Sequence, residues 1–485
     1  MHFLISLLFC TLTQPIDSLK ETKPDSTTTT IDTTSPYTTS PQHTTTTQQK
    51  KQQGHWGYAL SGFYGIVPKG DKEIKRIVKH NRTWTIGAQL MHTPLPSDGN
   101  PYDEDYNYPT MSVGFNYNHY QRVDLHRDAD NYDFGLAQPV DYMSHLGNVF
   151  TIFGAFDRPL LRHPQKWQFD YSLQFGVGYT PKKYNPVNNV DNEMISTHFL
   201  IYCGLGVHAT YALTPEWGLR TGLEFQHHSN GALSRPNKGS NAINPMIGLV
   251  YRPYVSERKQ RDDEWNSQAK SAAKGVGEDS EDNYHYDYLN FSIGVGAKAL
   301  YEEWVRTQFE IPPGEPDYQT DHFKTYMAYS LRMDYMRRWA RRWATGVGVD
   351  VLYGSYSDRV REIDEEEGFD LRHSPWSFGI SVKHEAFYKR ISCAMSFGLY
   401  LDRHMGHSAR RVEQPFYETV GLRYDTGLLD GLKLGFNVKA HAFKADFTEL
   451  VVALPIRIRV KSSHKKYQSS NYDNFTQSIS SSHGG

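Results

Sequence analysis

The sequence predicts an all-β protein, built as a transmembrane antiparallel β-barrel of about 14–16 strands. Its composition is the first reason: aromatic residues reach 14%, although hydrophobic residues make up only 38% and mean hydropathy is -0.63. A barrel wall with one face to lipid and the other to a polar lumen needs this mixture. The second reason is a strict alternation of apolar and polar residues over long segments, which is the period of a β-strand. The third is that no segment after the N-terminus approaches the ~18 continuous apolar residues of a membrane helix.

Both ends of the chain are predicted to lie outside the barrel. Residues 1–20 contain one apolar run that is too short to cross a membrane as a helix, and we interpret them as a signal peptide. Residues 21–53 are rich in Thr, Ser and Gln, and residues 461–485 are similarly polar, so neither segment has much apolar surface to bury. We expect a disordered Thr-rich tether and a disordered tail. The 3 cysteines are too few for a disulfide framework.

The segment 167–180 shows the strand pattern most clearly. Apolar residues from Trp167 to Tyr179 occupy every odd position, and polar residues or glycine occupy the even positions. Such runs exceed the about 5–6 residues of an average sandwich strand and reach the ~9–11 residues that a tilted strand needs to cross a bilayer. The same pattern predicts strands near residues 57–66, 82–92, 108–120, 147–157, 167–180, 196–213, 217–230, 243–254, 285–302, 322–338, 342–357, 376–388, 391–403, 414–426, 432–443 and 447–460.

A charged loop at residues 255–284 divides the predicted strands into two sets. We expect residues 54–254 to form the first part of the barrel and residues 285–460 to form its second part. A single large barrel is favoured, because every strand within a membrane needs hydrogen-bonded neighbours on both sides. An eight-stranded barrel followed by a second β-unit is the alternative.

The strand predicted at residues 217–230 ends in an unusual way. Its even positions are polar or glycine and suit a lumen, whereas its odd positions are mostly apolar from Trp217 to Phe225 and then end in His227 and Ser229. Residues i and i+2 share one face of a strand. The imidazole and the hydroxyl are therefore expected side by side on the lipid-facing wall, at one end of the strand.

This pair has the residue types of a nucleophilic hydrolase site. His227 would take the proton of Ser229, whose oxygen would attack an acyl carbonyl. The negative oxygen that forms would be held by the side-chain amide of Asn230 and by the backbone N–H groups of Gly231 or Ala232. The alternative is a pair of interfacial polar side chains without any chemistry.

The sequence around the pair resembles a known family. Residues 227–231 (HHSNG) and, after a short insert, residues 236–239 (PNKG) are similar to the H-x-S-N and P-N-x-G motifs of the lipid A deacylases, which are PagL-like proteins also called lipid A 3-O-deacylases or acyloxyacyl hydrolases. Residues 65–68 and 184–189 agree with this, and the resemblance covers roughly residues 55–254. It implies a multi-pass β-barrel in the outer membrane of a bacterial cell that hydrolyses an ester-linked acyl chain of lipid A.

The same resemblance assigns His227 as the base and Ser229 as the nucleophile. The third member of the family's site, a glutamate, falls at Asn241, which can still orient an imidazole but stabilises its cation less. An asparagine at this spacing is also typical of outer-membrane phospholipase A, a calcium-dependent enzyme with the same H-x-S-N-G motif and an arginine directly after it. Ala232 occupies the position of that arginine, so lipid A deacylase is favoured and a phospholipase-type esterase is the alternative. We expect no cofactor, and calcium only for the phospholipase alternative.

The direction of the strand decides which lipid the pair meets. If the first strand begins in the periplasm, the strand that ends near Ser229 is the seventh and ends at the outer leaflet, where lipid A resides. Arg235 and Lys238 in the following loop could then bind lipid A phosphates, and solvated loop charges are the alternative. One carboxylate, of Asp446 or Glu449, could approach the site only if two smaller barrels form, and a structural role at the lumen or rim of the barrel is favoured for both residues.

Charge and residue spacing bear on the partners of the protein. A net charge of -2 gives no indication of nucleic-acid binding, and the spacing of His, Asp and Glu predicts no metal cluster. We expect lipid A or lipopolysaccharide as the substrate and outer-membrane lipids as the surroundings, with the oligomeric state open. A third alternative, from another functional class, is a non-enzymatic barrel that serves as a pore or a structural protein.

Overall fold

The computed structural model describes residues 56–458, apart from residues 71, 96–97, 121, 129–135, 163–165, 254–283, 410–414 and 443. The predicted signal peptide, the predicted tether, the predicted tail and nearly all of the charged loop at 255–284 lie outside the described residues. Strands make up most of the described chain, and short helices occur in the connections between them. The all-β prediction is confirmed.

Eight antiparallel strands of the first half close into a barrel. They are β1 (Trp56–Ile66), β2 (Val78–His92), β3 (Thr110–His119), β6 (Val149–Arg162), β7 (Trp167–Tyr179), β8 (Phe199–Ala212), β9 (Trp217–Ser229) and β10 (Ser240–Tyr251). Each barrel strand pairs with the next one, and β1 pairs with both β2 and β10, which closes the ring. Two short strands, β4 (Val123–Leu125) and β5 (Ser144–His145), extend from β2 outside the ring.

Eight strands of the second half close into a barrel of their own. They are β11 (Tyr286–Ala299), β12 (Thr325–Ala340), β13 (Trp343–Gly354), β14 (His373–Tyr388), β15 (Ile391–Met405), β16 (Phe416–Asp425), β17 (Lys433–His441) and β18 (Lys444–Arg457). All neighbours are antiparallel, and β11 pairs with β12 on one side and β18 on the other.

The expectation of one large barrel is therefore wrong, and the alternative of an eight-stranded barrel with a second β-unit is confirmed. The ladder between β1 and β10, with Leu60 opposite Leu249, leaves the first ring without an open edge for β11. The requirement that every strand has two neighbours is met separately in each ring.

The wall of the first barrel has an apolar outer face and a polar inner face. Many outward side chains are large and exposed, among them Leu60 (61%), Ile152 (59%) and Val177 (61%). On the inner face, Arg220 is buried and lies 3.4 Å from Asp157. This is the arrangement of a barrel that faces lipid outside and a polar lumen inside. Within the described ranges, no helix is long and apolar enough to cross a membrane.

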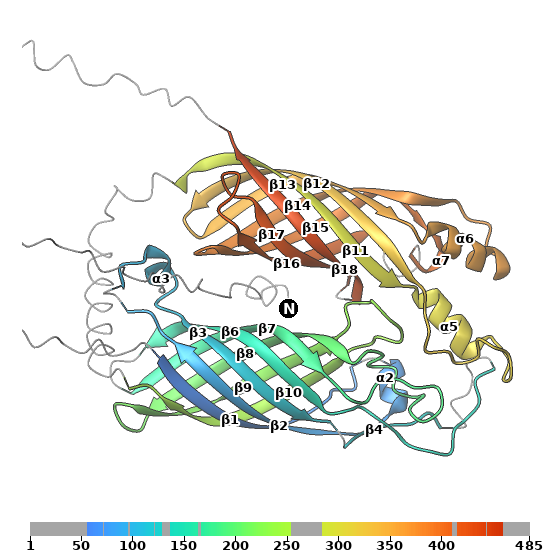
Figure 1. Cartoon of the computed structure of the whole chain (residues 1–485), viewed down its shortest axis with the longest axis horizontal. Helices are drawn as coiled ribbons and strands as arrows, with labels where there is room; N and C mark the ends of the chain where they lie inside the picture. Colours follow the sequence, from blue (N-terminus) through green and yellow to red (C-terminus); the bar gives the residue numbers. More distant parts are fainter. Residues whose placement is uncertain are drawn as a thin grey trace, which may run out of the picture.

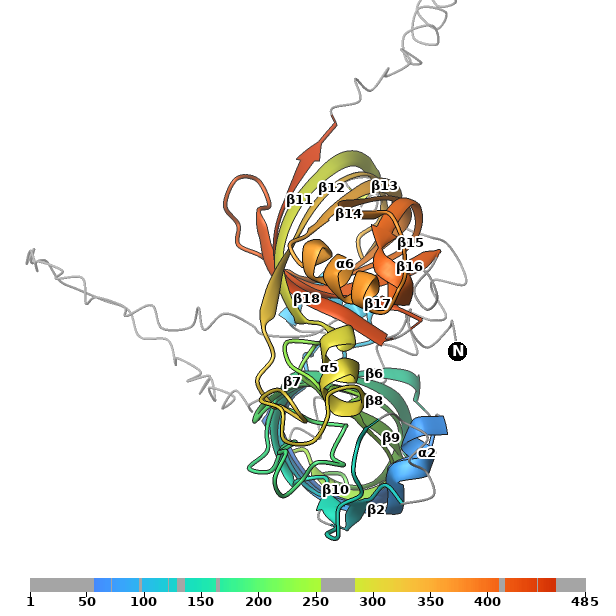
Figure 2. The same cartoon turned by 90° about the vertical axis from the view of Figure 1, so that its right-hand side faces the viewer.

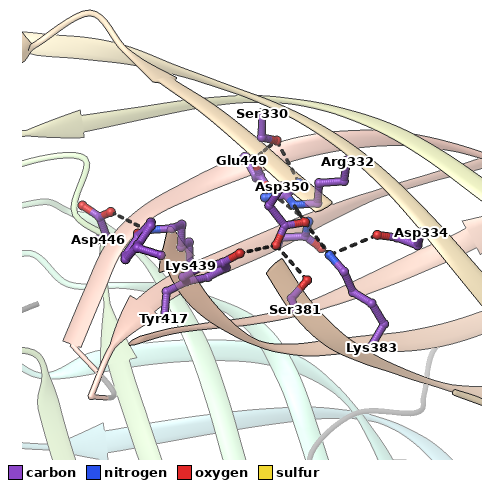
Figure 3. A network of polar contacts seen from close by, with 12 residues as sticks. Ser330, Arg332, Asp334, Asp350, Ser381, Lys383, Tyr417, Lys439, Asp446 and Glu449 are labelled. Atoms are coloured by element: carbon purple, nitrogen blue, oxygen red, sulfur yellow. Dashed lines mark hydrogen bonds and ion pairs between the residues drawn. The ribbon is translucent and has the colours of Figure 1, made fainter. Parts of the chain in front are cut away.

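The interior of the second barrel holds a network of ion pairs and hydrogen bonds, shown in Figure 3. Arg332 on β12 lies 2.6 Å from Glu449 on β18, and Lys383 on β14 lies 2.6 Å from Asp350 on β13. Tyr417 on β16 donates to the same aspartate at 2.5 Å. Buried charges are tolerated only when they are paired, and these charges are paired with one another. Their contacts also connect distant parts of the wall across the lumen.

The connections are mostly long at one end of the molecule, where the turn between β17 and β18 is a short exception, and mostly short at the other. The long connections carry α2 (Lys72–Ile77), α5 (Tyr301–Phe309), α6 (Ser357–Glu366) and α7 (Gly406–Ser408), which gather at one end in Figure 1. Short turns dominate the opposite end, where the connection with α3 (Pro101–Asp105) is an exception. Strand β1 starts at the end of the molecule with the short turns, and β18 also finishes there.

The two barrels lie side by side with their walls in contact (Figures 1 and 2). Phe175 on β7 stacks on Phe436 on β17, with ring centroids 4.7 Å apart. Near α3, the buried ring of Tyr106 lies 5.5 Å from that of Phe156 in the first barrel and 5.6 Å from that of Tyr388 in the second. At the opposite end, Figure 2 shows α5 between the two barrels. The barrels therefore touch at several heights along their walls.

Candidate active site

The last residues of β9 lie at the end of the first barrel that carries the long connections. Leu223 on this strand faces outward and is 46% exposed, and His227 and Ser229 follow on the same face. The neighbouring strands bring Cys203 on β8 and Asn241 on β10 opposite His227. The outer wall thus presents a thiol, an imidazole and an amide in one row across three adjacent strands.

Asn241 orients the imidazole of His227. Its Oδ1 lies 2.8 Å from Nδ1 of His227, because the two residues are direct partners in the ladder between β9 and β10. An amide oxygen only accepts hydrogen bonds, so Nδ1 carries the proton and Nε2 keeps a lone pair. An imidazole in this tautomer can receive a proton from a hydroxyl at Nε2.

Ser229 lies two residues further along the same face and is only 9% exposed. Its partner in the ladder between β8 and β9 is Ile201. Among the residues that the structure describes, no hydrogen bond joins the Ser229 hydroxyl to the His227 ring. Hydrogen bonds of this kind are often long in the absence of substrate and shorten in the complex. The structure thus brings the two side chains to one face without linking them.

The residues after Ser229 form a tight loop between β9 and β10. Oδ1 of Asn237 accepts a hydrogen bond from the backbone N–H of Asn230 at 3.1 Å. The side-chain amide of Asn230 donates to Oγ of Ser196 at 3.0 Å and to the carbonyl of Ser234 at 3.2 Å. Both hydrogens of this amide are used within the chain, which favours a structural role for it over the oxyanion contact expected from the sequence.

Gly231 and Ala232 have left-handed backbone conformations, with φ values of 64° and 71°. This conformation costs a residue other than glycine about 1–2 kcal/mol, and such strain is concentrated at functional sites. In the described part of the chain, neither of these two backbone N–H groups donates a hydrogen bond. Within these ranges, both N–H groups therefore remain available to another acceptor.

Gly239 leaves room for the ring of His227. A β-carbon at this position would lie 2.7 Å from Cε1 of His227 and 3.4 Å from its Nδ1. The φ value of Gly239, 74°, also lies in the left-handed region, where glycine is favoured. The glycine of the P-N-x-G motif is thus explained by the imidazole that it borders.

The two cations of the loop have partners within the chain. Nε of Arg235 donates to the carbonyl of Ala299 at 2.9 Å, and its guanidinium lies over the ring of Tyr301. The ammonium group of Lys238 lies 2.5 Å from a carboxylate oxygen of Glu193, in the connection between β7 and β8. These contacts hold the loop in place. A lipid phosphate near the loop would therefore bind cations that already have partners within the chain.

Two separate barrels do form, but the carboxylates of Asp446 and Glu449 do not join the site. Both form ion pairs inside the second barrel (Figure 3). Thr448 between them faces outward, and its hydroxyl donates to the carbonyl of Gly231 at 3.2 Å. No sequence signal marks this threonine as part of the site, because it belongs to an ordinary alternating strand far from the motif.

Fold and site together define a class of protein. The barrel is of the outer-membrane type, and its outward wall carries a hydroxyl and an imidazole oriented by an amide, with the backbone N–H groups of Gly231 and Ala232 in the turn that follows. In the ranges that the structure describes, no group of three or more His, Cys, Asp and Glu side chains could hold a metal ion. A hydroxyl and an imidazole on one face of a strand are residue types that hydrolases also use.

Family models match both halves of the chain. Residues 106–250 match lipid A 3-O-deacylase (PagL), and residues 287–458 match acyloxyacyl hydrolase, C-terminal domain. The chain belongs to the PagL-like family of lipid A deacylases. The resemblance of the first half is confirmed, and the second half, which the motifs did not assign, matches a domain of the same family.

Comparison with solved structures gives only distant likenesses. The ferric enterobactin receptor from Pseudomonas aeruginosa is 11% identical over 80% of this chain, with a TM-score of 0.21, and this chain spans only 54% of that receptor. The siderophore receptor PirA from the same organism is 8% identical over 84% of this chain and 82% of its own, with a TM-score of 0.19. At such low TM-scores, these receptors inform neither the fold nor the function. No curated protein matches the sequence.

Proposed function

We propose that this protein hydrolyses an ester-linked acyl chain of lipid A, with Ser229 as the nucleophile and His227 as the base. Oγ of Ser229 would attack the ester carbonyl while Nε2 of His227 takes its proton, and the imidazolium would then protonate the leaving alcohol of lipid A. A water molecule, activated by the same imidazole, would release the fatty acid from the acyl-enzyme. Asn241 would keep Nδ1 protonated throughout.

The observation that carries this proposal is the 2.8 Å hydrogen bond between His227 and Asn241 on the outward wall. A polar pair on a lipid-facing surface is costly unless it is solvated or has a function. A pore or a scaffold does not need an imidazole fixed in one tautomer on the same face as a hydroxyl. Membership of the PagL-like family favours lipid A as the substrate.

We place the site at the outer leaflet of the bacterial outer membrane. Barrels of this membrane have short periplasmic turns and longer extracellular loops, and the long connections of this chain lie at the end that carries Ser229. A lipid A molecule in the outer leaflet would reach Ser229 laterally, without leaving the membrane. Its phosphates would then lie near the loop that carries Arg235 and Lys238.

Mass spectrometry of lipid A from cells that produce the protein tests this proposal. Wild type should remove one acyl chain, and Ser229→Ala should leave the full set, because loss of a serine nucleophile costs about 10⁶-fold in rate. Thr221→Ala, an outward-facing substitution on the same strand, is the matched control and should behave as wild type. Lysophospholipid in place of deacylated lipid A would indicate a phospholipase, and no change in either lipid would indicate a non-enzymatic barrel.

A further inference from the structure

The second barrel binds the turn at Gly231 and Ala232, which follows Ser229, through the carbonyl groups of both residues. The hydroxyl of Thr448 on β18 donates to the carbonyl of Gly231 at 3.2 Å. The backbone N–H of Ala299, at the end of β11, donates to the carbonyl of Ala232 at 2.8 Å. The carbonyl of Ala299 accepts in turn from Arg235 at 2.9 Å, so each side of the contact both donates and accepts.

These bonds fix the direction of a backbone donor. A carbonyl and the N–H of the next residue belong to one planar peptide group and point in opposite directions. The hydrogen bond from Thr448 to the Gly231 carbonyl therefore directs the N–H of Ala232 away from Thr448. Ala232, with a φ of 71°, is the strained residue of the turn, and without this bond it could relax and rotate that N–H with it.

The turn is also enclosed by side chains of both barrels. A β-carbon at Gly231 would lie 2.2 Å from Oγ1 of Thr448 and 3.0 Å from Cδ1 of Ile201 on β8. Ala232 is completely buried. The position of the turn therefore depends on the second barrel as well as on the barrel that carries Ser229.

We propose that the second barrel completes the active site, and that Thr448 is a positioning residue for the deacylation reaction. Thr448 touches no reacting atom. It acts through the N–H of Ala232, which would donate to the negative oxygen of the tetrahedral intermediate. This inference rests on the proposed function, and it gives the second barrel a task in the reaction.

The test compares purified full-length wild type with Thr448→Val and Thr448→Ser, using lipid A in mixed micelles and the release of fatty acid. Valine keeps the shape but lacks the hydroxyl, so kcat should fall about 10- to 100-fold, somewhat less than when an oxyanion donor is removed outright. KM should stay within about twofold, because the lost interaction forms only in the transition state. Serine keeps the hydroxyl and should restore kcat to within about threefold of wild type.

Thr221→Val is the matched control. It removes a similar bond, from a threonine hydroxyl to the carbonyl of Met246 at 3.0 Å, on the outer wall of the first barrel, and it should leave kcat unchanged. Migration of unheated samples on a gel shows that each variant is folded, and Thr448→Ala replaces the valine variant if that one does not fold. Wild-type kcat in the variant without the hydroxyl, or equal losses in it and in Thr448→Ser, would overturn the inference. The proposed function fails separately, if wild type releases no fatty acid or Ser229→Ala is equally active.

Discussion

The imidazole of His227 has little freedom to turn. Asn241 binds its Nδ1 at 2.8 Å, and Gly239 lies so close that a β-carbon there would be 2.7 Å from Cε1. A base held in one orientation needs little reorganisation during the reaction. This arrangement requires a hydrogen-bond acceptor at position 241, and either an amide or a carboxylate oxygen meets that requirement.

Substitution of Asn241 tests this role. Asn241→Ala should lower kcat by about 100-fold or more, because Nδ1 loses its acceptor and the ring can adopt the wrong tautomer. Asn241→Glu should keep at least the wild-type kcat, since a carboxylate accepts the same bond and stabilises the imidazolium better. Initial rates of fatty-acid release measure both, with Ile243→Ala on β10 as the control for damage to the strand. A wild-type rate in the alanine variant would contradict the role of Asn241.

The sequence predicts the position of a single residue well where the alternation of a strand determines it. His227 and Ser229 lie on one outward face because side chains alternate along a strand. The expected oxyanion contact of Asn230 shows the opposite case. Its amide binds Ser196 at 3.0 Å, and this partner lies on a different connection that no local pattern relates to it.

At the scale of elements, the loop between β9 and β10 owes its shape to its own motif. Asn237 fixes the start of the loop, because its side-chain oxygen accepts a hydrogen bond from the backbone N–H of Asn230 at 3.1 Å. Gly239 ends the loop directly beside His227. The motif residues thus position the base, although most of them touch no substrate in the proposed reaction.

Gly239→Ala should lower kcat by about 10- to 100-fold while the barrel stays folded, because the added carbon displaces the ring and a shift of about 1 Å is enough for such a loss. Gly368→Ala is the matched control, since Gly368 also has a positive φ, 83°, but a β-carbon there would meet no atom within 4 Å. Fatty-acid release and gel migration of unheated samples measure activity and folding. Equal losses in the two variants would show that a general effect on folding, rather than contact with His227, is the cause.

The strand β18 connects the interior of the second barrel to the site. Glu449 points inward and is held by Arg332 at 2.6 Å and by Ser330 at 2.6 Å. Its neighbour Thr448 points outward to Gly231. Because adjacent residues of a strand face opposite sides, the network that fixes Glu449 also limits the movement of Thr448.

For the whole molecule, the sequence predicted sixteen strands of barrel type, and their division into an eight-stranded barrel and a second β-unit was only the less favoured alternative. Alternation reports which side chains face lipid and which face the lumen, and this is the same in a large barrel and in two small ones. The partner of β10 is set by a ladder to β1, which lies far away in the chain. The contact between the barrels is hidden for a similar reason: Phe175 and Phe436 stack on each other, yet in sequence they resemble any outward aromatic residue.

The proposed reaction requires that Ser229 in the intact two-barrel protein is an activated nucleophile. Reaction of the folded full-length chain with a long-chain alkyl fluorophosphonate, followed by mass spectrometry of its peptides, tests this requirement. Such a reagent modifies a serine where a base activates the hydroxyl and donors hold the negative oxygen. We predict a single adduct on Ser229, a loss of fatty-acid release in proportion to labelling, and no adduct in His227→Ala. The opposite result is loss of activity with Ser229 unmodified and the adduct on another residue. That result would show that Ser229 is not the activated nucleophile.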